Sequence, residues 1–319
     1  MIISRTPLRI SFVGGGTDMK YFYQRETGMV ISAAIDKYIY IIVKKRFDKK
    51  IVLNYSKREI VDSTSQIKHQ LIKASMELLG IEDSIEITSI ADIPSEGSGL
   101  GSSSSFTVGL INALSTFIGK NLNQKEIARL ACIVEIEICK SPIGKQDQYG
   151  ASIGGLKKIM FNSDETVKVS KIKNNNKLYQ NLESNIILLN SNITRSASKI
   201  LKKQKDNKDD NIANLSSIAA QVEVFEDHLK NQFFDKIIDD IHEYWLKKKT
   251  LVSSNVKNDL EDIYNKMVPD FCAAGKICGA GGGGYFLFFK NNNFPNFNES
   301  YFDVKIDTLG SVIIYNNYI

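Results

Sequence analysis

The first half of the chain combines strand-like segments with one helical stripe. Short segments rich in β-branched residues, several of them alternating between apolar and polar positions, are typical of strands. The strands predicted on this basis are segments 2–3, 8–13, 30–43, 50–55 and 84–90. Residues 67–79 instead carry apolar side chains three and four positions apart and end at Gly80, which predicts a helix. The pattern indicates a strand-rich α/β region.

Helical periodicity dominates the middle of the chain. A glycine- and serine-rich segment at 94–105 is followed by an apolar stripe over 106–118, which stops before Gly119. A second stripe predicts a helix over 124–139, and residues 140–150 are then expected to form a loop. Two helices are therefore predicted, each adjacent to a polar segment that can carry chemistry.

A polar stretch suggests a domain boundary in the second half. The composition shifts after residue 160, and the segment KIKNNNK at 171–177 has neither strand nor helix periodicity. Domain boundaries tend to fall in exposed polar linkers, so we place one near residue 180. The chain is expected to contain an N-terminal domain, 1–180, and a C-terminal domain, 181–319.

The C-terminal part is predicted to mix helices with short strands. Most of the region 195–267 has amphipathic helical character, interrupted by a charged segment at 202–211 that is expected to be a solvated loop. A second glycine-rich run, 279–284, leads directly into an apolar segment. The predicted strands of this part are segments 185–190, 285–289, 304–306 and 312–315.

The composition is that of a globular protein. The chain has 319 residues, of which 43% are hydrophobic and 24% charged, which excludes a disordered or collagen-like chain. The net charge of +5 fits an anionic small ligand, and equally a simple compositional bias. Apolar runs are far shorter than the roughly 20 residues that span a bilayer, and the N-terminus lacks a signal peptide pattern. We therefore expect a cytoplasmic protein without a membrane partner.

Cysteines and histidines indicate no disulfide framework and no histidine-built metal site. The cysteines form no CxxC pair and lie mostly in apolar stretches, as buried thiols of a reducing compartment do. The histidines are too far apart in sequence for the ligand spacing of zinc or iron sites. The residues concerned are Cys132, Cys139, Cys272, Cys278, His69, His228 and His242.

The segment 97–105 has the features that a phosphate-binding loop needs. Gly97, Gly99 and Gly101 permit positive φ angles and close approach of the backbone to a ligand. The helix that follows would point backbone N–H groups at an anion, and the serine hydroxyls can cap the helix or reach a hydrated Mg²⁺. A flexible loop with a well-capped helix is the alternative interpretation.

Two other phosphate motifs do not fit. A Walker A loop requires Ser or Thr after Gly-Lys, and neither Gly-Lys pair, at 144–145 and 275–276, has one. A formal GxGxxG occurs at 279–284, but it precedes the predicted strand 285–289 instead of a helix. A dinucleotide-binding Rossmann fold is therefore disfavoured.

Three separated motifs together resemble those of the GHMP kinase superfamily. They are TPLRISFVGGGTD (6–18), PSEGSGLGSSSS (94–105) and KICGAGGGGYFLF (276–288). The resemblance implies a two-domain α+β fold, with the active site in the cleft between an N-terminal mixed α/β domain and a C-terminal ferredoxin-like α+β domain. Within the superfamily, GGGTD and the segment SPIGKQDQY (141–149) are most similar to heptose 7-phosphate kinases, with L-fucokinases as the nearest competitor.

The resemblance also implies roles for individual residues. Asp147 matches the catalytic aspartate, and Arg9 matches the basic residue of the first motif, which would steady charge in the transition state. A Mg²⁺ ion would be held by Ser103 and Glu135, with Glu137 as the rival because the two glutamates cannot share a helix face. ATP would be bound by Gly97, Gly99, Leu100, Gly101, Ser102, Ser103 and Ser104.

Substrate recognition is assigned in the same way. Asp18 resembles the aspartate that binds sugar hydroxyls. Arg195 is the candidate for a phosphate already present on the substrate, with Lys140 and Lys145 next in line. The other residues expected at the substrate are Gly15, Gly16, Thr17, Gly281 and Gly282.

These assignments favour one function and leave alternatives open. The resemblance implies ATP-dependent phosphorylation of the C1 hydroxyl of D-glycero-D-manno-heptose 7-phosphate, giving the 1,7-bisphosphate toward nucleotide-activated heptose for surface polysaccharide. An L-fucose or other hexose 1-kinase is the alternative within enzymes. An RNA-binding module and a catalytically inactive sugar sensor are alternatives of other classes, although +5 is a modest charge for RNA binding. We expect ATP, Mg²⁺ and a sugar phosphate as ligands, no nucleic acid, and a monomer or homodimer.

Overall fold

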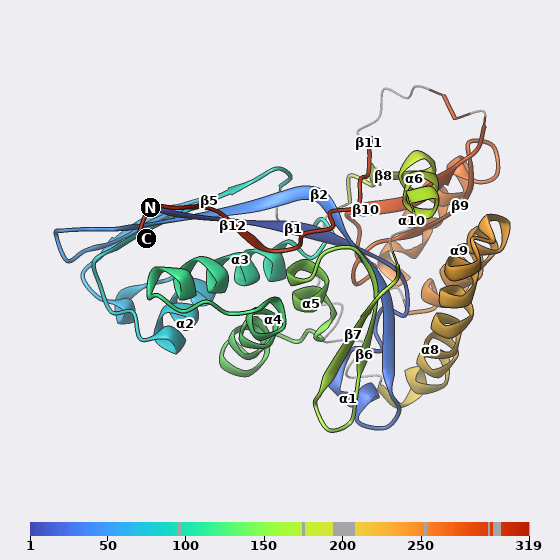
Figure 1. Ribbon diagram of the computed structural model, residues 1–319. Coiled ribbons are helices and arrows are strands. Elements are labelled where there is room, and N and C mark those ends of the chain that lie inside the picture. The colour runs from blue at the N-terminus through green and yellow to red at the C-terminus, as the bar shows by residue number, and fades with distance from the viewer. Residues whose placement is uncertain are drawn as a thin grey trace.

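The computed structural model describes residues 1–94, 97–173, 176–193, 208–251, 254–292, 294–295 and 301–318. Within these residues the chain forms an eight-stranded sheet and a four-stranded sheet. Figure 1 shows the large sheet extending from the two chain termini toward the small sheet, with helices beneath it and at its far end. In the described part of the chain, no helix is both long and apolar enough to cross a membrane.

The eight-stranded sheet is built on two long strands. β1 (Ile2–Val13) and β2 (Gly28–Lys45) pair antiparallel along most of their length. The first part of β2 also pairs with β6 (Leu156–Phe161), and its last part pairs with β5 (Ile85–Ala91). Because β2 changes partner along its length, it connects the part of the sheet that contains β6 with the part that contains β5. The other strands are β3 (Ile51–Asn54), β4 (Arg58–Val61), β7 (Val167–Lys171) and β12 (Val312–Asn316).

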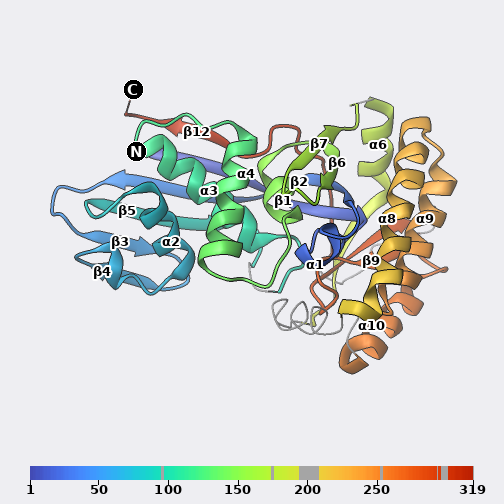
Figure 2. The same cartoon turned by 90° about the horizontal axis from the view of Figure 1, so that it is seen from below.

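Helices cover one face of this sheet. α3 (Ser102–Phe117) lies against β1 and β2 and is flanked by three further helices (Figure 2). Because sheet and helices enclose it, α3 is buried on nearly all sides, including Ser105 and Thr107. The stripe predicted from Phe106 onward is only part of this buried surface, and Phe106 itself is half-buried and packs against the core. The neighbouring helices are α2 (Gln70–Leu79), α4 (Gln124–Cys132) and α5 (Gln146–Ser152), and two short helices are α1 (Lys20–Tyr23) and η1 (Thr64–Gln66).

Two predicted elements have different boundaries in the structure. The strands expected at 2–3 and 8–13 form the single strand β1, because a register shift after Pro7 accommodates the residue that lacks an N–H. The helix expected over 124–139 is α-helical only in α4. It continues as a π-helical turn, η2 (Ile133–Ile138). The wider turn rotates the later side chains, and Ile138 is exposed where the stripe predicted burial.

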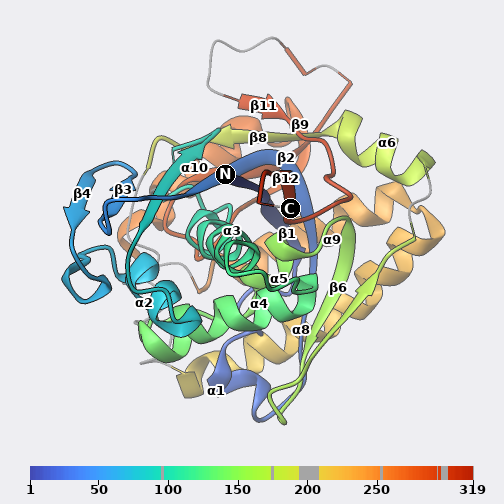
Figure 3. The ribbon, with the colours of Figure 1, turned by 60° about the vertical axis from the view of Figure 1, so that its left-hand side comes forward.

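The second sheet is antiparallel in the order β11-β8-β10-β9. Figure 3 shows β8, β9 and β11 together at one edge of the molecule. Among the described residues, three long helices come between β8 and β9, which together with the strand order is consistent with the expected ferredoxin-like domain. The elements are β8 (Ile186–Asn190), β9 (Cys272–Ile277), β10 (Tyr285–Lys290), β11 (Tyr301–Asp303), α6 (Asn176–Asn185), α8 (Lys208–Asn231), α9 (Phe234–Lys248) and α10 (Ser254–Met267).

Aromatic packing joins these helices to the second sheet. Trp245 of α9 stacks on Tyr264 of α10 with ring centroids 5.4 Å apart, and meets Phe286 of β10 edge-on at 5.8 Å. Phe225 of α8 contacts Phe12 of β1 at 5.8 Å, so the same helical layer also touches the first sheet. These contacts hold α9 next to the junction of the two sheets.

The last strand returns to the first sheet. β12 pairs antiparallel with β1, and the Asn317 N–H donates to the Met1 carbonyl at 3.0 Å, so the two termini lie side by side (Figure 1). The segment 304–306, expected as a strand, contributes an isolated bridge between Ile306 and Ile35. A boundary near residue 180 would fall inside α6, and the division 1–180 and 181–319 stays a prediction.

Candidate active site

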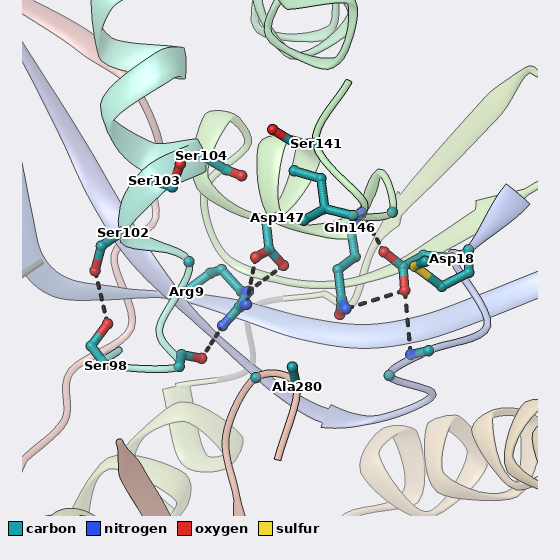
Figure 4. A pocket seen from close by; sticks show the side chains of 18 of the residues that line it. Arg9, Asp18, Ser98, Ser102, Ser103, Ser104, Ser141, Gln146, Asp147 and Ala280 are labelled. Atoms are coloured by element: carbon teal, nitrogen blue, oxygen red, sulfur yellow. Dashed lines mark hydrogen bonds and ion pairs between the residues drawn. The ribbon is translucent and has the colours of Figure 1, made fainter. Parts of the chain in front are cut away.

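A pocket lies where the three glycine-rich motifs meet. Its walls come from the turn after β1, the loop and first turn of α3, the loop before α5, and the segment after β9 (Figure 4). Among the residues predicted from sequence, it is lined by Arg9, Gly15, Gly16, Asp18, Gly97, Gly99, Gly101, Ser102, Ser103, Ser104, Glu135 and Asp147. Side chains far apart in the sequence therefore face one space.

Arg9 grips the Asp147 carboxylate with two parallel hydrogen bonds. Arg9 Nε donates to Asp147 Oδ1 at 2.8 Å, and Nη2 donates to Oδ2 at 2.7 Å (Figure 4). The guanidinium, in a residue 2% exposed, also donates through Nη1 to the Gly99 carbonyl at 2.7 Å. The Asp147 side chain keeps 25% of its surface exposed. The fork fixes the orientation of a carboxylate that remains accessible from the pocket.

The loop before α3 is shaped by its glycines. Gly99 and Gly101 have φ angles of +74° and +77°, and Cβ atoms there would lie 2.8 Å from the Cys278 carbonyl oxygen and 3.1 Å from Arg9 Cγ. α3 then begins without a side-chain cap, so the N–H groups of its first turn are open to an anion. The backbone therefore fits a phosphate group.

Glu135, in the π-helical turn η2, lies beside this loop. It is 1% exposed, and its carboxylate accepts hydrogen bonds from Ser103 Oγ at 2.9 Å and Gln148 Nε2 at 2.6 Å. Burial raises the pKa of Glu135 to about 7, although the hydrogen bonds act in the opposite direction. Glu137 is exposed on another side of the turn and does not line the pocket.

Asp18 occupies the opposite part of the pocket. Its carboxylate accepts hydrogen bonds from the Gln146 backbone N–H at 3.1 Å, from Gln146 Nε2 at 3.2 Å and from the Gly16 N–H at 3.3 Å (Figure 4). Burial, and to a smaller extent the Asp147 charge, raises the pKa of Asp18 to about 6. A Cβ at Gly144 would come within 2.0 Å of Asp18 Oδ2, so glycine is needed there.

Several predicted residues lie outside the pocket wall. Thr17 is buried and its hydroxyl donates to the Gly14 and Met29 carbonyls, which is a structural arrangement. Lys145 forms an ion pair with Glu165 at 2.5 Å. The remaining predicted residues that do not line the pocket are Leu100, Lys140, Gly281 and Gly282. Residues 194–207, which include Arg195 and part of the charged segment 202–211, lie outside the described residues.

Sequence reasoning missed other residues of the pocket. Lys248, at the end of α9, reaches it from the C-terminal part of the chain and donates to the Gly279 carbonyl at 2.7 Å. In sequence it is the middle of three consecutive lysines, so nothing distinguishes it from a solvated charge. The others include Met19, Ser98, Ser141, Ile143, Gly144, Gln146, Leu251 and Ala280.

Comparisons with known proteins identify the family. The family model described as GHMP kinases N terminal domain matches residues 55–155. The D-glycero-alpha-D-manno-heptose 7-phosphate kinase of Campylobacter jejuni is 32% identical over 90% of this chain and 89% of that protein. The L-fucokinase/L-fucose-1-P guanylyltransferase of Bacteroides fragilis is 25% identical over 89% of this chain, which spans 34% of the length of that protein.

A solved structure has the same fold. The D-glycero-D-manno-heptose 1-phosphate kinase from Bacteroides thetaiotaomicron aligns over 100% of both chains with a TM-score of 0.78 and 21% identity. The likeness confirms the α+β fold expected from the three motifs. Together with the near full-length relative from Campylobacter jejuni, it leads to one conclusion. This chain belongs to the GHMP kinase family, and it is an ATP-dependent kinase.

Proposed function

We propose that this kinase transfers the γ-phosphoryl group of ATP to the C1 hydroxyl of D-glycero-D-manno-heptose 7-phosphate. The product would be the 1,7-bisphosphate, toward nucleotide-activated heptose for surface polysaccharide. The name of the Campylobacter jejuni relative supports this substrate. The observation that carries the proposal is the Arg9–Asp147 fork, which faces the glycine loop across one pocket.

Asp147 is assigned the role of general base. The C1 hydroxyl oxygen would attack the γ-phosphorus while its proton passes to the Asp147 carboxylate, and ADP would leave with the electrons of the broken P–O bond. Arg9 orients the carboxylate and contributes positive charge near the phosphoryl group in transfer. The uncapped first turn of α3 would hold the ATP phosphates.

The proposal includes a Mg²⁺ ion. Ser103 and Glu135 fit such an ion, because a hydroxyl and a carboxylate stand 2.9 Å apart at the edge of the phosphate loop. Mg²⁺ takes hard oxygen ligands and keeps several waters, so two protein oxygens suffice beside phosphates. When bound, the ion would neutralise charge on the phosphates. Ser103 and Glu135 would hold it in place.

Asp18 is assigned to sugar binding. Its two oxygens can accept hydroxyl hydrogens from one sugar ring, while the hydrogen bonds from Gln146 and Gly16 keep the carboxylate oriented. Gly15 and Gly16 add no side chains of their own to the pocket wall beside it, which leaves more room for a sugar. The part of the pocket around Asp18 would then hold the sugar, and the phosphate loop would hold ATP, on either side of Asp147.

An ADP-release screen tests the proposal. Heptose 7-phosphate, heptose 1-phosphate, mannose 6-phosphate, L-fucose and galactose would each be offered with Mg²⁺ and ATP, and the product would be located by ³¹P NMR. We expect the highest kcat/KM with heptose 7-phosphate and phosphorylation at C1. Preference for heptose 1-phosphate would reverse the assigned position, and preference for L-fucose would favour the fucokinase alternative. Absence of ADP release with every sugar would favour an inactive sugar sensor.

A further inference from the structure

Two buried lysines stand beside the pocket without a carboxylate partner. Lys248 on α9 is 6% exposed, and Lys276 on β9 is fully buried. Their ammonium groups donate to backbone carbonyls, Lys248 to Gly279 at 2.7 Å and Lys276 to Ser11. Among the described residues, neither ammonium group has an acidic side chain within ion-pair distance. Both charges are therefore bound to neutral groups.

Burial of two ammonium groups without a carboxylate partner costs free energy when no ligand is bound. Transfer of an ammonium group out of water is strongly unfavourable unless an opposite charge compensates it. Burial and the charge of Lys276 lower the pKa of Lys248 well below its usual value, and burial lowers the pKa of Lys276 to about 8. Asp147, whose charge acts on Lys248, is already bound by the Arg9 fork. An anionic group bound in this corner of the pocket would compensate the charge of a protonated Lys248.

The position of Lys248 is defined by its neighbours. It is a pocket-lining residue, and its Nζ lies 4.0 Å from the point where a Cβ of Gly15 would stand. The Tyr244 hydroxyl accepts a hydrogen bond from the Gly15 N–H at 3.1 Å. Tyr244 also presents its ring to both ammonium groups, with Nζ 5.8 Å from the centroid for Lys248 and 5.3 Å for Lys276. The cationic group is thus held on the Gly15 side of the pocket.

We propose that Lys248 binds a phosphate monoester carried by the sugar substrate, and that Lys276 and Tyr244 position it. The inference rests on the proposed function, because it assumes a phosphorylated sugar in this pocket. Gly15 belongs to the motif assigned to the sugar, which favours the substrate phosphate as the ligand. The γ-phosphate of ATP has the same chemistry and is the competing source, because Gly279 also packs against Gly99 of the phosphate loop.

Binding measurements without turnover test the inference. Isothermal titration calorimetry would compare the wild type, Lys248→Gln and the control Lys247→Gln, whose lysine pairs with Glu243 at 2.8 Å. The probes are heptose 7-phosphate, mannose 6-phosphate, unphosphorylated mannose and a non-hydrolysable ATP analogue. Lys248→Gln should weaken binding of both sugar phosphates by about 10–100-fold, the worth of a charge-assisted bond, and leave mannose and the nucleotide within about twofold.

Three outcomes overturn the inference. Equal weakening for the nucleotide analogue would assign Lys248 to the γ-phosphate, and equal weakening for mannose would make it a general sugar contact. Unchanged binding of the sugar phosphates would leave Arg195 as the candidate. If Lys248-dependent binding of heptose 7-phosphate is found without its phosphorylation, the proposed function fails and the inference stands.

A stability measurement separates binding from folding. Because an uncompensated buried charge is costly, Lys248→Met should unfold at the same temperature as the wild type or higher, while losing affinity for sugar phosphates. A fall in Tm of more than about 4 °C would make the Lys248–Gly279 hydrogen bond structural and overturn the inference.

Discussion

At the scale of single residues, the pocket is organised by pairs in which one side chain orients another. Arg9 holds Asp147 through two hydrogen bonds of 2.7 and 2.8 Å, and Gln148 and Ser103 hold Glu135. Pre-oriented groups lose little freedom when a substrate binds, which is how positioning lowers a reaction barrier. Substitution of either carboxylate should therefore affect chemistry more than folding.

Asp147→Asn tests the assigned base. The amide cannot accept the hydroxyl proton, so kcat should fall by roughly 10²–10⁴-fold, the usual worth of a positioned base. The KM for ATP should stay within about twofold, because the phosphate loop is untouched. Steady-state kinetics with heptose 7-phosphate provide the measurement. A variant that keeps more than a tenth of the wild-type kcat would exclude Asp147 as the base.

Glu135→Ala and Glu137→Ala form a matched pair on one helical turn. Glu135 is buried beside Ser103, whereas Glu137 is exposed and outside the pocket wall. Removing a metal ligand should raise the Mg²⁺ concentration for half-maximal activity by about 10-fold or more for Glu135→Ala, and hardly for Glu137→Ala. A Mg²⁺ titration at fixed ATP distinguishes them, and the reverse result would refute the assignment of Glu135.

At the scale of elements, the π-helical turn η2 alters the end of the helix that carries both glutamates. The Cys139 N–H bonds to the Val134 carbonyl five residues back at 2.9 Å, so the turn holds one residue more than an α-helix would. An extra residue changes the direction of later side chains by about 100° relative to a regular helix. Glu135 still follows the buried Ile127 and Ala131 at intervals of four, so helical periodicity places it on the inner face. Ile138, later in the turn, is exposed where 3.6 residues per turn predicted burial.

Strand β6 contains a buried lysine whose protonation should make the free energy of unfolding depend on pH. Lys157 is fully buried and donates to the Gly155 carbonyl at 3.0 Å. Burial lowers the pKa of Lys157 to about 7, against roughly 10.4 in an unfolded chain. Between these values the unfolded state binds more protons, so wild-type stability should rise with pH from about 7 to 10.

Lys157→Met should remove that dependence. We expect the variant to be more stable than the wild type by more than about 1 kcal/mol at pH 7, with the advantage shrinking toward pH 10. Urea unfolding at several pH values provides the measurement. The control is Lys168→Met on β7, an exposed position that should show no such trend. A constant difference between Lys157→Met and wild type across this range would contradict the charged, buried state of Lys157.

At the scale of the whole molecule, glycines allow the third motif to pack directly on the phosphate loop. A Cβ at Gly284 would lie 2.4 Å from the Gly97 and Ser98 carbonyl oxygens, and a Cβ at Gly279 would lie 2.7 Å from Gly99 Cα. The Tyr285 N–H donates to the Ser98 carbonyl at 3.0 Å across the same contact. The absence of side chains at these glycines thus lets the backbone next to the second sheet pack closely on the phosphate loop.

Gly284→Ala should disturb both stability and nucleotide binding. The added methyl group must displace the phosphate loop, and φ at this position is +86°, which disfavours any side chain. We expect a fall in Tm together with a rise of about 10-fold or more in the KM for ATP, since a small displacement of a binding loop is costly. Gly80→Ala is the control, because its φ is +70° and nothing lies within 4 Å of its Cβ position.

The control should lower stability by about 1–2 kcal/mol through backbone strain alone and leave the KM for ATP unchanged. Thermal unfolding and steady-state kinetics on both variants provide the comparison. An ATP KM in Gly284→Ala equal to that of Gly80→Ala would show that the contact between the third motif and the phosphate loop has no role in binding.

The sequence by itself determined the family, the fold class and much of the pocket wall. These features depend on local patterns: glycines followed by serines and a helix, and motifs in a fixed order along the chain. Local spacing also predicted the C-terminal end of the helix at Gly80, which adopts the left-handed conformation expected of a terminating glycine. Such features need no knowledge of distant residues.

The tertiary structure alone decided which side chains meet. Arg9 and Asp147 are 138 positions apart and become partners because β1 and the start of α5 border one pocket. Lys248, one of three consecutive lysines, is buried because its place on α9 faces the junction of the two sheets. Glu135 meets Ser103 because η2 packs beside α3. Burial and charge compensation arise from packing between distant segments, and periodicity along the chain does not contain that information.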